Sequence, residues 1–181
     1  MYARAVRSLA VSAIGRDRPG IVAAVTGVLL RHGVNVEDTQ MTILRGHFTM
    51  MLFLAAPDEL DLVTLERDLS QPETGLEELS VAELEEFGPG PEPTHTVTVY
   101  GADHPGIVHA AASALAEREI DITDLNSRLV DDEGGEALYV LMMEVALPAG
   151  ALAEELDVAL DEVGSREGVE VTLHELERDE L

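Results

Sequence analysis

One eight-residue pattern occurs twice and constrains this chain more than any other feature. The copies span residues 15–22 and 101–108, and read Gly-Arg-Asp-Arg-Pro-Gly-Ile-Val and Gly-Ala-Asp-His-Pro-Gly-Ile-Val. A short β-branched segment precedes each copy and an alanine- and leucine-rich segment follows it, so each copy predicts a turn from a strand into a helix. The first glycine permits a sharp exit from the strand, and the proline suits the first helical turn. The second glycine leaves the amides of the helix start open to a small anion.

The segments around the two copies predict the same order of elements. Apolar periodicity in the first half predicts strands and helices at residues 6–14, 19–32, 35–44, 48–55, 57–69 and 79–87. The second half predicts them at residues 96–100, 105–117, from 120 onward, 139–147, 151–163 and 169–176. The order predicts an α+β fold: two tandem ferredoxin-like βαββαβ domains, each a four-stranded antiparallel sheet with two helices on one face.

A proline- and glycine-rich stretch separates the two halves. Residues 88–94 contain three prolines and two glycines, which disfavour both helix and strand. We therefore expect a first domain at residues 1–87, a linker at 88–94 and a second domain at 95–181. The second copy also gains five residues, Asp131–Gly135, which predict a longer acidic turn in its hairpin.

The charge of the chain limits its partners. The formal net charge is −25, and all 11 basic residues are arginine. A field of this sign repels nucleic acid and anionic membranes, so neither is an expected direct partner. The acidity serves solubility or, alternatively, attracts a basic protein partner. With no apolar run long enough to span a membrane and no signal-peptide core at Met1–Arg4, we expect a soluble cytoplasmic protein.

The sequence contains little that predicts catalysis or metal binding. The chain has no cysteine, no phosphate-loop lysine and no nucleophile-elbow motif. His104 and His109 lie near Asp103, but their spacing of five does not suit one helix face, so we expect no metal and no cofactor. The four methionines of the two central strands are predicted to fill the core: Met50, Met51, Met142 and Met143.

The motifs resemble a known family. The segment 17–22, followed by Asn35-Val36 on the next strand and Phe48 on the third, resembles the ACT domain, a regulatory module that binds amino acids. The tandem arrangement is similar to the glycine cleavage system transcriptional repressor group. The resemblance covers residues 5–87 and 95–178, and implies ligand sensing, oligomerisation and no catalysis by the module itself.

The resemblance also implies where a ligand would bind. In the first copy it implies the turn, the helix start and the following strand: Asp17, Arg18, Gly20, Ile21, Val22, Asn35 and Val36. In the second copy it implies a possible second site: Asp103, His104, Gly106, Ile107, Asp121 and Ile122. Helix-start amides can take a carboxylate, and an asparagine offers both a donor and an acceptor to a zwitterion.

The two copies differ at two of these positions. His104 occupies the position of Arg18, and Asp121 occupies the position of Asn35. A carboxylate cannot donate a hydrogen bond and would repel a ligand carboxylate, so the first copy is expected to be the better amino-acid site. The alternative for both copies is that the glycines and proline serve only the turn, and that Asn35 supports only the local backbone.

These observations leave two hypotheses for function. The leading one is a non-enzymatic sensor, in which a small amino acid binds where two ACT units meet and alters a surface offered to a protein partner, with transcriptional control of amino-acid metabolism as one outlet. The alternative is a ligand-free module that dimerises through exposed strand edges and sheet faces. An enzyme would need polar groups converging in a pocket, which nothing in the sequence predicts.

Overall fold

The strand before the first turn lies inside a four-stranded sheet. The computed structural model describes residues 6–84, 90–131 and 137–176, and the chain divides into two compact units, Met1–Gly88 and Pro89–Leu181. The elements of the first unit are β1 (Val6–Arg16), α1 (Ile21–Arg31), β2 (Asn35–Leu44), β3 (His47–Pro57), α2 (Leu62–Leu69) and β4 (Leu76–Leu84). The strand order is β2-β3-β1-β4 and every pairing is antiparallel.

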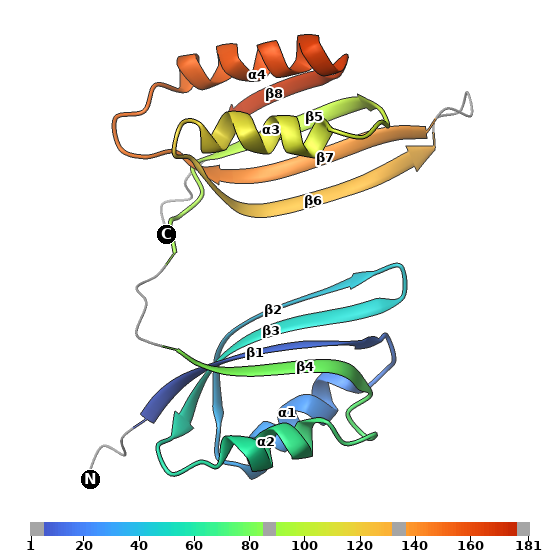
Figure 1. Ribbon diagram of the computed structural model, residues 1–181, viewed down its shortest axis with the longest axis vertical. Coiled ribbons are helices and arrows are strands. Elements are labelled where there is room, and N and C mark those ends of the chain that lie inside the picture. The colour runs from blue at the N-terminus through green and yellow to red at the C-terminus, as the bar shows by residue number, and fades with distance from the viewer. Residues whose placement is uncertain (1–5, 85–89, 132–136, 177–181) are drawn as a thin grey trace. The chain divides into compact units, whose positions relative to one another are not determined.

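The second unit repeats this topology (Figure 1). Its elements are β5 (His95–Ala102), α3 (Ile107–Ala116), β6 (Asp121–Asp131), β7 (Ala137–Ala146), α4 (Ala153–Glu167) and β8 (Glu170–Glu175). Its strand order is β6-β7-β5-β8, again antiparallel. The predicted fold class, two tandem ferredoxin-like domains, is confirmed.

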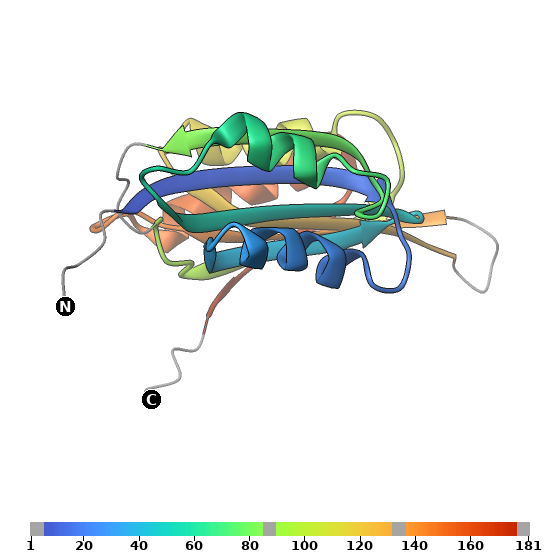
Figure 2. The ribbon, with the colours of Figure 1, turned by 90° about the horizontal axis from the view of Figure 1, so that it is seen from below.

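One face of each sheet is buried under two helices. Figure 2 shows α1 and α2 side by side across the first sheet. Along β3, Phe48, Met50, Leu52 and Leu54 are buried, while their neighbours are exposed, because successive residues of a strand point to opposite faces. The buried stripe of α1 packs on them and completes an aliphatic core: Ile21, Val25, Val28 and Leu29.

The same alternation corrects the expectation for the methionines. Met50 and Met143 are buried, at 3% and 1% exposure, but Met51 and Met142 are 49% and 47% exposed. Adjacent residues on a strand cannot both face the helices. Only one methionine of each pair therefore fills the core.

Several element boundaries differ from the sequence expectation. The second helix begins at Leu62 and not near Pro57, because Pro57 ends β3 and the Asp61 side chain caps the helix by accepting from the Val63 amide at 3.3 Å. The fourth helix continues to Glu167, four residues past its expected end. It stops where Gly168 adopts the left-handed conformation, with φ of 69°.

Some expected features fall on residues outside the described ranges. Residues 90–94 form no helix or strand, but residues 85–89 are not described, so the exact boundaries of the domains and linker stay predictions. The acidic turn expected at Asp131–Gly135 also lies outside the described residues, apart from Asp131 at the end of β6.

Candidate functional site: the two strand-to-helix turns

Backbone geometry at the first turn explains its proline and second glycine. The Ile21 amide donates to the Arg18 carbonyl at 3.4 Å, and Gly20 between them has φ of 88° and ψ of 0°. These angles are those of the third residue in a type II turn, where proline favours the second position and glycine the third. The Gly20 carbonyl then accepts from the Ala24 amide at 2.9 Å, so Gly20 is also the N-cap of α1.

The start of α1 is open. Gly20 provides no side-chain cap, and the first turn of the helix contains no acidic residue. Apart from Gly20 and its two chain neighbours, no atom of the described residues lies within 4 Å of the place where a Gly20 side chain would begin. The first amides of a helix have no partner within the helix and carry partial positive charge. This geometry suits a small anion.

Arg18 belongs to the turn just before this helix start, and its exposed side chain extends to the loop after α2. Its Nη2 donates to the backbone carbonyl of Glu73, and its guanidinium lies against Gly75. On the other side, the Asp17 amide donates to the Gly46 carbonyl at 3.0 Å, in the hairpin between β2 and β3. The turn is therefore tied to two loops that are distant in sequence.

The first glycine of the motif has a role that the sequence did not reveal. A side chain on Gly15 would begin 2.5 Å from the Gly75 carbonyl oxygen, and one on Gly101 would begin 2.7 Å from a methyl carbon of Val169. Neither glycine has a positive φ. They are required for close approach to the last strand or its loop, and not for the sharp exit that was expected.

The structure does not bring Asn35 and Val36 to the turn of their own unit. Asn35 pairs with Ala55, which pairs with Ser8 of β1, whereas the turn follows Arg16. Eight residues of strand separate these ends, about 26 Å at about 3.3 Å per residue. A small ligand cannot span that length.

The second unit has the same separation. Asp121 and Ile122 pair with the end of β7 that lies beside His95, whereas the turn follows Ala102 at the opposite end of β5. In both units, therefore, the expected site residues form two groups at opposite ends of one sheet.

The second turn repeats the backbone geometry of the first. Gly106 has φ of 113° and ψ of −22°, and its carbonyl accepts from the Ala110 amide at 2.8 Å. His104 Nε2 lies 2.8 Å from the Glu167 carbonyl, and Nδ1 lies 3.1 Å from the Pro105 carbonyl. The Pro105 and then the Glu167 carbonyl raise the pKa of His104 above its ordinary 6.5, because only the charged ring can donate to both.

A cavity of about 530 Å³ lies at this second turn. It is lined by Asp103, His104, Pro105, Gly106, Ile107, Val108, His109 and Tyr139. Asp121 and Ile122 are not among its lining residues. Tyr139 was not among the site residues predicted from the sequence. The alignment of the two copies could have identified it, because Tyr139 aligns with the fully buried Phe48 and adds a hydroxyl that the first unit lacks.

Other kinds of site are not found in the described parts of the chain. Within residues 6–84, 90–131 and 137–176, no group of three or more histidine, aspartate or glutamate side chains could hold a metal ion. No helix in these ranges is both long enough and apolar enough to cross a membrane.

Together, the fold and turns define a class: a tandem pair of ferredoxin-like domains, each with a glycine-capped helix start, which is open in the first unit. The ACT domain model matches residues 7–77. UPF0237 protein PAE3582 of Pyrobaculum aerophilum is 37% identical over 62 residues, which are 34% of this chain and 69% of that protein. The chain belongs to the ACT domain family, whose fold is a regulatory one.

Longer similarities cover both units. Phosphoserine phosphatase SerB2 of Mycobacterium tuberculosis is 26% identical over 171 residues, which are 93% of this chain but 41% of the phosphatase. The chain thus spans about two fifths to one half of the length of the first curated relatives that it matches.

Two solved structures match nearly the whole chain. A protein of unknown function from Galdieria sulphuraria is 28% identical, with a TM-score of 0.80 and coverage of 96% of this chain and 100% of that one. A candidate glycine cleavage system transcriptional repressor is 18% identical, with a TM-score of 0.67 and coverage of 96% and 99%. The second likeness shows the shared tandem fold.

Proposed function

We propose that this protein is a non-enzymatic regulator that senses a small amino acid at the turn of its first ACT domain. The observation that carries the proposal is the open start of α1 at Gly20, in a turn that also contains the cationic side chain of Arg18. Helix-start amides and the guanidinium together suit a carboxylate, and the exposed Asp17 carboxylate nearby suits an ammonium group.

The site requires two copies of the chain. Since Asn35 and Val36 lie about 26 Å from the turn of their own unit, a ligand that contacts both groups binds the turn of one copy and the β2 start of another. Ligand binding then favours the dimer that buries it, and the dimer offers a surface to a protein partner. Gene control would act through that partner, because the net charge of −25 opposes direct binding to nucleic acid.

Isothermal titration calorimetry of the full chain with the twenty amino acids tests the proposal. Serine is tested first because the name of the similar phosphatase refers to phosphoserine, and glycine is tested next as the smallest ligand. We expect saturable binding of at least one of them. No binding up to millimolar concentration, by a protein shown to be folded, would overturn the proposal.

A pair of glycine variants localises the site. Gly20→Asn tolerates the left-handed backbone but fills the open space above the helix-start amides, so binding should be lost. Gly150→Asn is the matched control, because Gly150 also has φ of 88° and open surroundings but lies between β7 and α4 of the second unit. Equal affinity of the two variants would place the ligand elsewhere.

Mixing two inactive variants tests whether the site is shared between copies. Gly20→Asn and Asn35→Ala should each abolish binding alone. A mixed dimer contains one intact site, formed by the unchanged turn of one chain and the unchanged Asn35 of the other. We therefore expect mixing to restore part of the binding capacity, and the absence of any restoration would contradict a site built from two chains.

The alternative function is dimerisation without a ligand. It is favoured by apolar side chains on the sheet face opposite the helices, where Met51 and Phe53 are 49% and 41% exposed. Analytical ultracentrifugation decides this: a ligand-free dimer that Phe53→Glu dissociates, together with no amino-acid binding, would support the interaction module.

A further inference from the structure

In the first unit, a side-chain hydrogen bond bridges the two helices. His32, the C-cap of α1, places Nε2 3.0 Å from Oδ2 of Asp68 on α2. The side chains are only 16% and 29% exposed. The seam between α1 and α2 is therefore closed by this contact at one end.

The corresponding positions of the second unit form no such bridge. The strand registers align Val11–Leu52 with Val97–Met143, so His32 corresponds to Arg118 and Asp68 to Ala159. Ala159 has no carboxylate to offer. Arg118 turns back to its own helix, where Nη1 donates to the Ala114 carbonyl at 2.9 Å.

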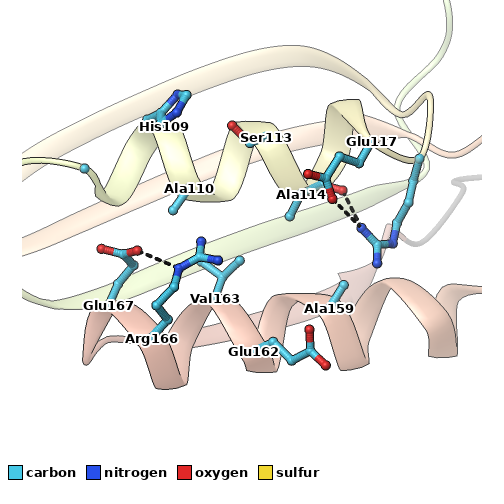
Figure 3. A pocket seen from close by; sticks show the side chains of 12 residues that line it. His109, Ala110, Ser113, Ala114, Glu117, Ala159, Glu162, Val163, Arg166 and Glu167 are labelled. Atoms are coloured by element: carbon cyan, nitrogen blue, oxygen red, sulfur yellow. Dashed lines mark hydrogen bonds and ion pairs between the residues drawn. The ribbon is translucent and has the colours of Figure 1, made fainter.

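A groove of about 420 Å³ opens between α3 and α4 as a result (Figure 3). Its floor consists of small side chains from both helices: Ala110, Ala114, Ala159 and Val163. The volume lies in the usual range of small-molecule sites, about 300–1,000 Å³. The groove is thus large enough for a small ligand and has no counterpart of the His32–Asp68 contact across it.

The extra length of α4 supplies one wall of the groove. In the first unit, α2 ends at Leu69 and a loop containing Pro72 follows, but α4 remains helical to Glu167. The added turns place Glu162 and Arg166 along the groove, one helical turn apart, as Figure 3 shows. This wall therefore carries both an anion and a cation; Figure 3 shows Arg166 extending toward α3, and Glu162 extending away from Arg166, toward the Ala159 end of the groove.

Much of the bonding capacity of these groups is not used within the described part of the protein and is open to solvent or a ligand. Arg166 Nε lies 3.0 Å from Oε1 of Glu167, which leaves the other guanidinium donors of Arg166 without a partner among the described residues. The side chains of Glu162, Ser113 and His109 form no hydrogen bond or ion pair within that same set. Charged and hydroxyl groups without partners, above an apolar floor, are typical of a ligand site.

The charges identify the class of ligand. Two of the three arginines that the structure describes in the second unit, Arg118 and Arg166, line this groove together with three carboxylates, Glu117, Glu162 and Glu167, in a chain that carries −25 as a whole. Simple anions are repelled by that field, and simple cations find carboxylates over the whole surface. A zwitterion avoids the repulsion and uses both signs at once.

We propose that the α3–α4 groove binds a small zwitterion, an α-amino acid or a dipeptide, with its carboxylate on Arg166 and its ammonium on Glu162. Glu162 and Arg166 are one helical turn apart, about 5–6 Å at their Cβ atoms, so both belong to the same short stretch of the groove wall. This site is separate from the strand-to-helix turns and does not depend on the function proposed above.

Two-dimensional ¹H–¹⁵N NMR of the full chain tests the site, with the twenty amino acids and glycylglycine as zwitterionic probes and inorganic phosphate and putrescine as single-sign probes. We expect a zwitterion to shift the amides of Ala110, Ser113, Ala159 and Val163 saturably. The amides of residues 20–22 report separately on the first turn, so the failure of one site is distinguishable from the failure of the other.

Three variants make the test specific. Arg166→Gln should weaken binding at least tenfold by removing a charge-assisted bond, and Ala159→Asp should do the same by pairing with Arg118 and closing the groove. Arg128→Gln removes an equal charge from β6, outside the groove, and should bind like the natural protein. The proposal is overturned if no zwitterion shifts the groove amides, if phosphate or putrescine shifts them as strongly, or if Arg166→Gln binds unchanged.

Discussion

The imidazole of His104 and the carbonyl of Glu167, 2.8 Å apart, join the second turn to the end of α4. The first unit has the same relationship, in which Arg18 donates to the carbonyl of Glu73 in the loop after α2. A histidine in place of arginine thus keeps a donor on the same connection. Histidine at this position keeps the hydrogen bond between the turn and the segment before the last strand, but it makes that hydrogen bond depend on pH.

The contact of His104 makes the stability of the second unit depend on pH. The carbonyls of Pro105 and Glu167 raise the pKa of His104 above its ordinary 6.5 in the folded state. A raised pKa stabilises the fold fully below pH 6.5, and this contribution is lost as the pH rises through the higher folded value. An NMR titration of the ring should find the raised pKa.

Replacing His104 with arginine should remove this pH dependence. His104→Arg recreates the residue of the first turn and remains charged throughout the window. Its thermal midpoint should vary less between pH 6 and pH 8 than that of the natural protein. A ring pKa at or below 6.5, or an unchanged pH profile in the variant, would contradict the role assigned to His104.

The fold could be predicted from the sequence because its signals are local and occur twice. Strand alternation, the helical stripe at Ile21–Leu29 and the turn motif each depend on residues close in sequence, and the second copy repeated all of them. The end of the fourth helix could not be placed as well. It depends on Gly168 adopting a left-handed backbone, and on the continuation of α4 where the first unit has a proline-containing loop.

The candidate site was only partly predictable for a different reason. The turn residues are contiguous, so their geometry followed from type II turn preferences. The anchoring of Arg18 on the 73–75 loop joins residues 55 positions apart, and no local pattern encodes it. Asn35 lies at the far end of the sheet because α1 returns the chain to that end before β2 begins. The predicted order of elements implies this placement, but Asn35 is close to the turn in sequence, which suggested that it is also close in space.

The contact between His32 and Asp68 should stabilise the first unit above pH 3.8 and lose this effect in acid. Hydrogen bonds from His32 and then from Arg67 lower the pKa of Asp68 below its ordinary 3.8. A lowered pKa stabilises the fold above pH 3.8, and this contribution is lost as the pH falls through the lower folded value. Asp68→Asn should therefore reduce the thermal midpoint at pH 6 and flatten its acid dependence, whereas Asp58→Asn, at an exposed site, should do neither.

Thr74 should be important for the loop that anchors Arg18. It is 2% exposed, and its hydroxyl lies 2.8 Å from the Leu69 carbonyl and 2.7 Å from the Gln71 carbonyl. Thr74→Val keeps the shape of the side chain but removes the hydroxyl that can donate a hydrogen bond to these carbonyls. The loss should lower the free energy of unfolding by about 1–3 kcal/mol.

Chemical denaturation measures that cost, and a second threonine provides the control. Thr26 bonds only along its own helix, to the Val22 carbonyl at 2.8 Å, so Thr26→Val should change stability by no more than about 0.5 kcal/mol. If Thr74→Val were equally harmless, the hydroxyl would not be holding the loop.

Two glycines of the first unit should respond to alanine with opposite signs. A methyl group on Gly15 would begin 2.5 Å from the Gly75 carbonyl oxygen, and the close strand and loop backbones can relieve this overlap only by moving. Gly15→Ala should therefore lower the free energy of unfolding by about 1–3 kcal/mol. Gly27 lies inside α1 with ordinary φ and with no neighbour within 4 Å in the described structure, so Gly27→Ala should raise it by about 0.5–1 kcal/mol.

Urea denaturation measures the free energy of unfolding of the two variants. It distinguishes a specific effect of the close contact between Gly15 and the 73–75 loop from a loss of stability that any substitution in the sheet or the helix would cause. If Gly15→Ala is neutral, the backbones of β1 and the 73–75 loop separate more easily than their distance implies. If both variants lose stability, the helix itself is constrained at Gly27 by something other than its local backbone. Only a loss at Gly15 with a gain at Gly27 fits a turn whose position depends on that close contact.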